Sequence, residues 1–167
     1  EEVGVPAVSR GAIDGAQAWR PETSVGHAGA DGDPAGPNQR WSFDFVFDNW
    51  RAVTDYARAE LAGQMTEQAR TLYLDGRNQL ISEKIQEGTV DTAPLYPREV
   101  VRGALEAGAS ALILIHNHPS GDPTPASADI SVTRVVVEAA KVFDISVHDH
   151  LIVGRGEVFS MRGRGLL

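Results

Sequence analysis

The sequence predicts an α/β fold in which helices pack against one mixed β-sheet. Three observations lead to this prediction. Segments with helical spacing alternate with short apolar segments along the chain, in the order α-β-β-α-β-α-β-β. Residues 110–115, SALILI, form an apolar run typical of a strand that is buried on both faces. Residues 97–108 begin with proline and end with glycine, as many helices do.

Local patterns locate the individual elements. Apolar residues at helical spacing follow the N-cap candidates Asp48 and Asn49, which predicts a helix over 48–61. Residues 69–75 alternate like a strand, the dipeptide DG at 75–76 indicates a hairpin turn, and residues 78–90 return as a second strand. The remaining patterns predict helices over 97–108 and 127–143 and strands over 110–115, 145–154 and 157–161.

Residues 1–40 differ in composition from the rest of the chain. They contain seven glycines, four prolines and seven alanines, without a sustained period. Such a segment buries too little apolar surface to offset the entropy of ordering it. We therefore expect a disordered tail or linker over 1–40 and one domain over 41–167. The chain starts with Glu1 rather than methionine, as a fragment of a longer protein would.

The composition limits the classes of partner. Of the 167 residues, 42% are hydrophobic and 23% are charged, which is typical of a soluble globular domain. The net charge of −8 opposes binding to DNA and to acidic membranes, so we expect neither partner. No apolar run is long enough to span a bilayer, and the acidic start EEVGVPAVSR differs from a signal peptide. The absence of cysteine excludes disulfides and thiolate zinc sites and suits a cytoplasmic protein.

The stretch HNHPSGDPTPASAD, residues 116–129, carries the candidate site. Side chains two residues apart on a strand point to the same face, so His116 and His118 should emerge together at the end of the apolar strand. The turn that follows leads to Asp129, in the first turn of the next helix. Two imidazoles and a carboxylate suit a Zn²⁺ ion with a fourth position left for water. An open site of this kind makes a nucleophile of the water.

Other interpretations of these residues stay open. Histidines near a loop are often surface residues or helix caps, and an aspartate at a helix start also favours the helix dipole. The same donor set suits Fe²⁺, Mn²⁺ or Co²⁺. A second HxH stretch, His148 to His150 with Asp149 between them, could bind a metal. A polar cluster at a strand end, supporting the core, is the simpler interpretation of that stretch.

The stretch 116–129 resembles the JAMM (MPN/JAB) metalloprotease motif in the form carried by the RadC family. The similarity extends to LYLDGRNQLISEKIQEGTVDTAPLYPREVVRGALEAGASALILIHNHPSGDP and to ISVHDHLIVG, and it covers about residues 42–167. It implies an MPN/JAB-like α/β fold, a mixed sheet sandwiched by helices with a cytidine-deaminase-like architecture. It also implies one Zn²⁺ per chain, held by His116, His118 and Asp129.

The resemblance further implies a catalytic glutamate at the entry to the first core strand. This position falls on Glu67 in TEQARTLYLD, and Glu83 is the competing carboxylate. Glu67 would take a proton from the activated water and later give it to the leaving amine. An acidic residue before a strand is usually solvated surface, so the sequence pattern alone does not identify Glu67.

The chain departs from the family motif at one position. The motif has a serine eight residues after the second histidine, where this chain has Ala126. That hydroxyl supports the oxyanion of the tetrahedral intermediate, and the loss of one such donor costs about 100–1000-fold in rate. Ser127 is the possible substitute, but one helical step rotates a side chain by about 100°. We therefore expect metal binding, with peptidase activity impaired by Ala126.

The resemblance implies a zinc-dependent hydrolase of peptide or isopeptide bonds, with a peptide or protein as substrate. The alternative is a non-catalytic MPN-type binding module associated with DNA repair or mobile elements. The helix-hairpin-helix DNA-binding region that is usual in the family has no counterpart in residues 1–40, and this weakens the hypothesis that the chain binds DNA. A zinc-dependent nuclease or another hydrolase using the same water is a third hypothesis. The sequence does not determine the oligomeric state.

Overall fold

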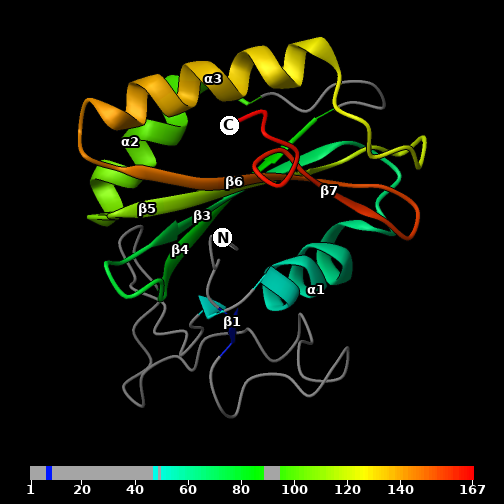
Figure 1. Cartoon of the computed structure of the whole chain (residues 1–167), viewed down its shortest axis with the longest axis horizontal. Coiled ribbons are helices and arrows are strands. Elements are labelled where there is room, and N and C mark those ends of the chain that lie inside the picture. Colours follow the sequence, from blue (N-terminus) through cyan, green and yellow to red (C-terminus); the bar gives the residue numbers. More distant parts are fainter. Residues whose placement is uncertain (1–6, 9–46, 49, 89–94) are drawn as a thin grey trace, which may run out of the picture.

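A five-stranded sheet forms the centre of the computed structural model, which describes residues 7–8, 47–48, 50–88 and 95–167 (Figure 1). The strand order in this sheet is β4-β3-β5-β6-β7. The strands are β3 (Gln68–Leu74), β4 (Leu80–Glu87), β5 (Ala111–Asn117), β6 (Ser146–Val153) and β7 (Val158–Ser160). The helices are α1 (Trp50–Leu61), α2 (Pro97–Ala107) and α3 (Ser127–Lys141). Two short strands, β1 (Ala7–Val8) and β2 (Phe47–Asp48), pair with each other.

Strand β5 is the middle strand of the sheet. It pairs antiparallel with β3 and parallel with β6, while β4 and β7 form the two antiparallel edges. The connection from β5 to β6 runs through α3, because parallel neighbours need a crossover. Helix α1 covers one face of the sheet, and α2 and α3 cover the other (Figure 1). The sheet is mixed and lies between helices, which confirms the predicted fold class.

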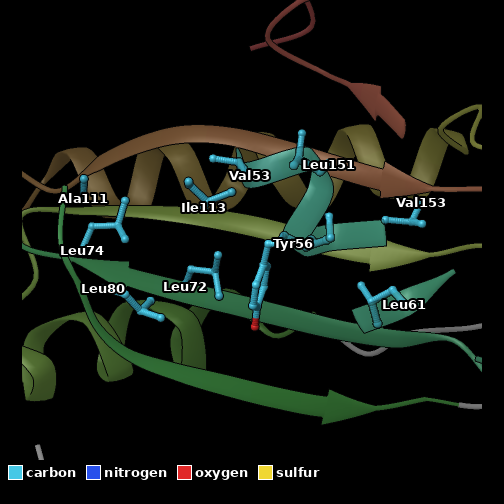
Figure 2. Packing of buried hydrophobic residues seen from close by; sticks show 12 residues of the cluster. Val53, Tyr56, Leu61, Leu72, Leu74, Leu80, Ala111, Ile113, Leu151 and Val153 are labelled. Carbon is cyan, nitrogen blue, oxygen red and sulfur yellow. The ribbon is translucent and has the colours of Figure 1, made fainter. Parts of the chain in front are cut away.

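The face covered by α1 holds one of two hydrophobic clusters (Figure 2). One side of the amphipathic helix α1 packs on alternating residues of β3, β5 and β6, because alternate side chains of a strand share a face. Burying one leucine or isoleucine side chain in this layer contributes about 1.5–3 kcal/mol. The fully buried members include Val53, Leu61, Leu72, Ile113 and Leu151.

The other set of alternating residues faces α2 and α3. Leu112 and Leu114 of β5 pack there against Val100 of α2 and Val136 of α3. The next residue of β5 with the same orientation is His116, since it follows Leu114 by two positions. The apolar face of the strand thus continues into a polar site at the end of the strand.

Most predicted elements are confirmed within a few residues of their predicted bounds. Gly108 ends α2 in the left-handed conformation, with φ 63°, as the helix-stop pattern predicts. Asp48 lies in β2, and the other predicted N-cap, Asn49, falls outside the described residues. Of the predicted tail over 1–40, Ala7 and Val8 are described, and the rest of that prediction also falls outside the described residues.

The turn between β3 and β4 differs from the predicted one. The chain reverses over Asp75–Gln79, and the left-handed residue is Asn78 with φ 59°, not Gly76. The carboxylate of Asp75 accepts hydrogen bonds from the backbone N–H groups of Arg77 (2.8 Å) and Gln79 (2.9 Å). This local hydrogen bonding makes the turn longer than the two-residue hairpin indicated by DG.

The described part of the chain contains no helix with both the length and the apolarity that crossing a membrane requires.

Candidate metal centre

Strand β5 brings two histidines to one end of the sheet. His116 is the sixth residue of the strand and is buried, with 4% of its surface exposed. His118 follows the strand directly and is half-buried. The backbone N–H of His118 still bonds to the carbonyl of Val153 at 2.9 Å, which holds this residue to the end of β6. The two Nε2 atoms are 3.0 Å apart.

The loop after His118 is held against the turn between β6 and β7. Gly121 has φ 92°, a conformation that side chains disfavour, and its carbonyl accepts the backbone N–H of Arg155 at 2.8 Å. A Cβ atom on Gly154 would lie 2.4 Å from the Gly121 carbonyl oxygen and 2.7 Å from a side-chain atom of Pro123. The close backbone packing at Gly154 therefore leaves no room for a side chain beneath the loop.

Helix α3 supplies the third candidate ligand. Asp129 is the third residue of the helix, and its Oδ2 accepts the backbone N–H of Ala126 at 2.7 Å. A carboxylate at this position satisfies one of the donors that a helix start leaves free, and the dipole of the helix favours its charge. The same hydrogen bond orients the carboxylate toward the two imidazoles.

The three side chains converge at a spacing that suits a tetrahedral ion. Asp129 lies 3.6 Å from the Nε2 atoms of both His116 and His118, through Oδ1 and Oδ2 respectively. Ligand bonds of about 2.0–2.1 Å would place tetrahedral ligand atoms about 3.3–3.4 Å apart. The nitrogen–nitrogen distance of 3.0 Å and the two nitrogen–oxygen distances of 3.6 Å bracket this value, and one ligand atom from each residue lies within 4.8 Å of the others. Among the described residues these three form the group of His, Cys, Asp and Glu side chains that could hold a metal ion.

The electrostatics of the group favour the deprotonated form of His116 and Asp129 but not of His118. Burial lowers the pKa of His116 to about 4, so its imidazole is neutral at physiological pH. Burial alone would raise the pKa of Asp129, but the contacts with both histidines and with the Ala126 N–H lower it to about 2. The pKa of His118 is raised, chiefly by the contact with Asp129, then by the hydrogen bond to the Asp122 carbonyl and least by the charge of Glu67, and burial opposes this rise.

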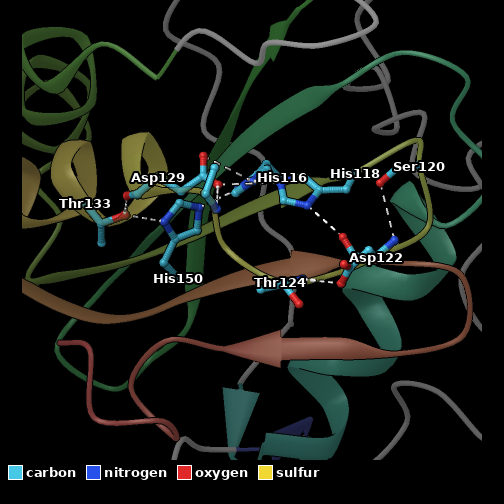
Figure 3. A network of polar contacts seen from close by, with 9 residues as sticks. His116, His118, Ser120, Asp122, Thr124, Asp129, Thr133 and His150 are labelled. Carbon is cyan, nitrogen blue, oxygen red and sulfur yellow. Dashed lines mark hydrogen bonds and ion pairs between the residues drawn. The ribbon is translucent and has the colours of Figure 1, made fainter.

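The outer nitrogens of the two imidazoles also have partners (Figure 3). Nδ1 of His118 lies 2.8 Å from the carbonyl oxygen of Asp122 and must carry a proton to bond to it. Nδ1 of His116 lies 2.7 Å from Nε2 of His150, a buried residue of β6. The sequence pattern missed His150 as a neighbour of this site, because the HDH stretch is far from residue 116 along the chain.

Glu67 is close enough to His118 for its charge to contribute to the raised pKa of that histidine. The antiparallel pairing of β3 with β5 ends at Ala69 and His116, and the same register extended by two residues would place Glu67 opposite His118. Glu67 is half-buried. Asn117 holds the backbone on both sides of this glutamate: its Oδ1 accepts the N–H of Gln68 at 2.8 Å, and its Nδ2 donates to the carbonyl of Thr66 at 3.0 Å. The clamp by Asn117 was not predicted.

Glu83, the competing carboxylate, lies elsewhere. It is on β4 and accepts hydrogen bonds from Tyr56 (2.5 Å) and Arg70 (3.1 Å). Arg70 also forms an ion pair with Glu60. Tyr56 belongs to the hydrophobic cluster on the α1 face, opposite the face that carries His116. The structure thus brings Glu67, not Glu83, toward the histidines.

Ala126 and Ser127 stand at the start of α3. Ala126 is the N-cap residue, with extended backbone, and offers no side-chain oxygen to the helix. Ser127 is the first residue of the helix and is exposed, as is Ala126. The spacing to Asp129 matches that of the motif, so Ala126 occupies the position of the missing serine.

The three side chains of the second HxH stretch, His148 to His150, contact different parts of the structure. Nε2 of His148 lies 2.8 Å from Oδ1 of Asn78, at the turn between β3 and β4. Asp149 accepts hydrogen bonds from the Ser160 hydroxyl (2.5 Å) and the backbone N–H of Arg162 (2.9 Å). His150 instead points toward His116 (Figure 3). The three side chains support different parts of the structure.

Comparison with known proteins shows the family of the chain. Residues 47–166 match the family model described as the RadC-like JAB domain. A UPF0758 protein of Rhodobacter capsulatus is 52% identical over 123 residues, which cover 73% of this chain and 58% of the relative. The chain therefore spans somewhat more than half the length of that relative. The chain belongs to the RadC-like JAB domain family.

Proposed function

We propose that the chain is a zinc-dependent hydrolase of the metallopeptidase type, with one Zn²⁺ ion per chain held by His116, His118 and Asp129. The observation that carries this proposal is the convergence of two imidazole nitrogens, 3.0 Å apart, and one carboxylate with an oxygen 3.6 Å from each nitrogen. Oxygen and nitrogen donors at this spacing fit zinc, and three protein ligands are the number found in catalytic zinc sites.

Zinc in such a site supplies a Lewis acid that lowers the pKa of a water molecule and polarises a carbonyl group. The residues of the chain do the rest. Glu67 accepts the proton of the attacking water and passes it to the nitrogen of the leaving amine. Its place opposite His118 and the clamp by Asn117 support this role. The proposed substrate is a peptide or isopeptide bond in a peptide or protein, and the proposed location is the cytoplasm.

Ala126 limits the rate in this proposal. A serine there would offer a hydroxyl to the oxyanion that forms when water adds to the carbonyl group. Without this donor we expect hydrolysis to be slower by about 100–1000-fold than in a chain with the complete motif. Ser127 is a poor replacement because it is one helical step away and exposed.

The second candidate function is a non-catalytic binding module of the MPN type, and Ala126 is the observation that favours it. In this case the metal stabilises the loop over 118–129, and a protein or a DNA-repair complex is the partner. The net charge of −8 gives the chain itself little attraction for DNA. Retention on DNA at low salt with a steep salt dependence would support the repair version of this alternative.

The metal assignment is tested by metal analysis after chelation and reconstitution with zinc. We expect about one zinc per chain, and a large loss in His116→Ala and in Asp129→Ala. His148→Ala is the matched control, because this histidine bonds to Asn78 and lies outside the proposed ligand set. Unchanged zinc content in His116→Ala would refute the site.

The hydrolase assignment is tested with a peptide library derived from cellular protein, with new termini read by mass spectrometry. Ala126→Ser should raise cleavage, and Glu67→Gln in the same background should abolish it while zinc stays bound. Glu83→Gln is the control for the loss of a carboxylate elsewhere. If Ala126→Ser, zinc-loaded, cleaves nothing above the level of its Glu67→Gln variant, the binding module becomes the better description.

A further inference from the structure

We propose that His150 and Thr133 are positioning residues that fix the tautomer of His116 and so direct its Nε2 lone pair toward the metal. This inference rests on the proposed metal site, but it concerns two residues outside the ligand set. Neither residue belongs to the motif stretch 116–129. The proposal follows from a chain of short contacts that begins and ends at candidate ligands (Figure 3).

A β-bulge brings His150 to this face of the sheet. The parallel register pairs Leu112 with Val147 but Ile113 with Asp149, so His148 is an extra residue in β6. After the bulge, His150 pairs with Leu114 and shares the face of Leu114 and His116. Regular alternation from Val147 would have put Asp149 on this face instead. Bulges often redirect a side chain next to a functional site.

Two close contacts connect His150 to its neighbours. Its Nε2 lies 2.7 Å from Nδ1 of His116, and its Nδ1 lies 2.6 Å from the hydroxyl oxygen of Thr133. The Thr133 hydroxyl in turn donates to the backbone carbonyl of Asp129 at 2.5 Å. His150 and Thr133 are 2% and 0% exposed, so bulk water does not compete for these bonds.

The donor-to-acceptor direction along these hydrogen bonds is set by the carbonyl of Asp129, which can only accept a hydrogen bond. The single hydroxyl proton of Thr133 goes to this carbonyl, so the Thr133 oxygen must accept a proton from Nδ1 of His150. A neutral His150 then has a lone pair on Nε2. Nδ1 of His116 must donate to it, which leaves the lone pair of His116 on Nε2.

The opposite direction is incompatible with the proposed ligand. If Thr133 gave its proton to His150, then Nε2 of His150 would donate to Nδ1 of His116. The remaining proton of a neutral His116 would sit on Nε2, the atom that faces Asp129 at 3.6 Å and His118 at 3.0 Å. A protonated nitrogen cannot bind a metal ion. The Thr133 hydroxyl therefore acts through His150 on the metal-binding atom of His116.

The arrangement gives both histidines an outer partner of known direction. His118 donates through Nδ1 to the carbonyl of Asp122, and His116 donates through Nδ1 to a chain that ends at the carbonyl of Asp129. Partners of this kind orient a ligand, and their loss typically costs about 10–100-fold in metal affinity. The hydrogen bonds that start at His116 end at the backbone of Asp129, the third ligand, so they link the position of β5 to that of α3.

The first test compares two substitutions of Thr133 in the full chain. Thr133→Val removes the hydroxyl at nearly constant volume, and Thr133→Ser keeps it. Zinc affinity is measured by competition with a chromophoric chelator. We expect Thr133→Val to weaken zinc binding by about 10-fold or more, and Thr133→Ser to stay within about 3-fold of the wild type. Equal affinities for Thr133→Val, Thr133→Ser and the wild type would overturn the proposal.

The second test changes His150, the middle residue of this series of hydrogen bonds. His150→Gln places an amide oxygen near the position of Nε2 and can accept from His116, whereas His150→Leu cannot. We expect His150→Leu to weaken zinc binding by about 10–100-fold and His150→Gln to restore part of the loss. Circular dichroism checks that each variant is folded, and the Thr133 pair decides the question if His150→Leu is not.

The third test reads the tautomer directly and does not depend on metal binding. Long-range ¹H–¹⁵N spectra of the metal-free chain, with ¹⁵N-labelled histidine, distinguish a protonated from an unprotonated ring nitrogen. We expect His116 to carry its proton on Nδ1 in the wild type, and a mixture of tautomers in Thr133→Val. A proton on Nε2 of wild-type His116 would overturn the proposal. If the wild type binds no zinc yet shows the Nδ1–H tautomer, the proposed metal function fails while the hydrogen-bond chain stands.

Discussion

The side-chain oxygen of Asn117 accepts a hydrogen bond from the backbone N–H of Gln68 at 2.8 Å. This bond joins the end of β5 to the start of β3, its neighbour in the sheet. Asn117, the last residue of β5, lies between His116 and His118 in the sequence, and Gln68 follows Glu67 directly. The side chain of Asn117 points to the face opposite His116, so it does not compete for the metal. One asparagine therefore links the histidines to the proposed proton acceptor.

We expect Asn117→Ala to separate metal binding from proton transfer. The change removes the hydrogen bonds to Thr66 and Gln68, and leaving these backbone groups without a partner should cost about 1–3 kcal/mol of stability. Zinc content should be unchanged, whereas any hydrolysis measured in the Ala126→Ser background should fall. Urea unfolding, metal analysis and peptide cleavage measure the three effects. Loss of zinc in proportion to loss of activity would instead show that Asn117 supports the ligands.

Zinc affinity should fall as the pH decreases, in two stages. The raised pKa of His118 means that this imidazole is the first ligand to take a proton, so one proton competes with zinc and affinity falls about tenfold per pH unit below that pKa. His116, with a pKa of about 4, adds a second proton only near that pH, and Asp129, with a pKa of about 2, still later. Chelator competition over a pH series measures the slope. A slope of two protons from the onset would contradict separate titration of the histidines.

Ala126→Ser should stabilise the chain as well as raise activity. A serine at this N-cap position can accept a backbone N–H of the first helical turn, while Asp129 already accepts the N–H of residue 126. The completed capping box should add about 0.5–2 kcal/mol to the free energy of unfolding. Thermal or urea unfolding of the metal-free chain measures this gain. Ala126→Gly, which lacks the hydroxyl, should leave cleavage unchanged even though glycine is itself a better N-cap residue than alanine.

Gly154→Ala should weaken metal binding without touching a ligand. The added Cβ would meet the carbonyl of Gly121 at 2.4 Å and the Pro123 ring at 2.7 Å. The loop must shift, and with it the carbonyl of Asp122 that orients His118. Zinc affinity, measured by chelator competition, should fall by about 10-fold.

Gly156→Ala is the matched control for that substitution. Gly156 has φ 96° and no atom within 4 Å of an added Cβ, so alanine there strains the backbone but does not push the loop. It should cost about 1 kcal/mol of stability and leave zinc affinity as in the wild type. Equal effects of the two substitutions on zinc affinity would mean that the loop position is not what Gly154 determines.

Local patterns in the sequence determined most of the elements and part of the site. The apolar run SALILI and the spacing HxH are properties of a single strand, so they predict that His116 and His118 emerge together. The position of Asp129 in a first helical turn also follows from neighbouring residues. Hairpin geometry was less predictable, because the carboxylate of Asp75, rather than Gly76, organises the turn.

The tertiary structure decided the rest, because it depends on which strands pair and in what register. The pairing of β3 with β5 brings Glu67 opposite His118 and lets Asn117 hold the backbone around it. The bulge at His148 turns His150 toward His116, although alternation along the strand gives His148 and His150 the same direction. A register is fixed by contacts between segments far apart in the chain, and no local period records it.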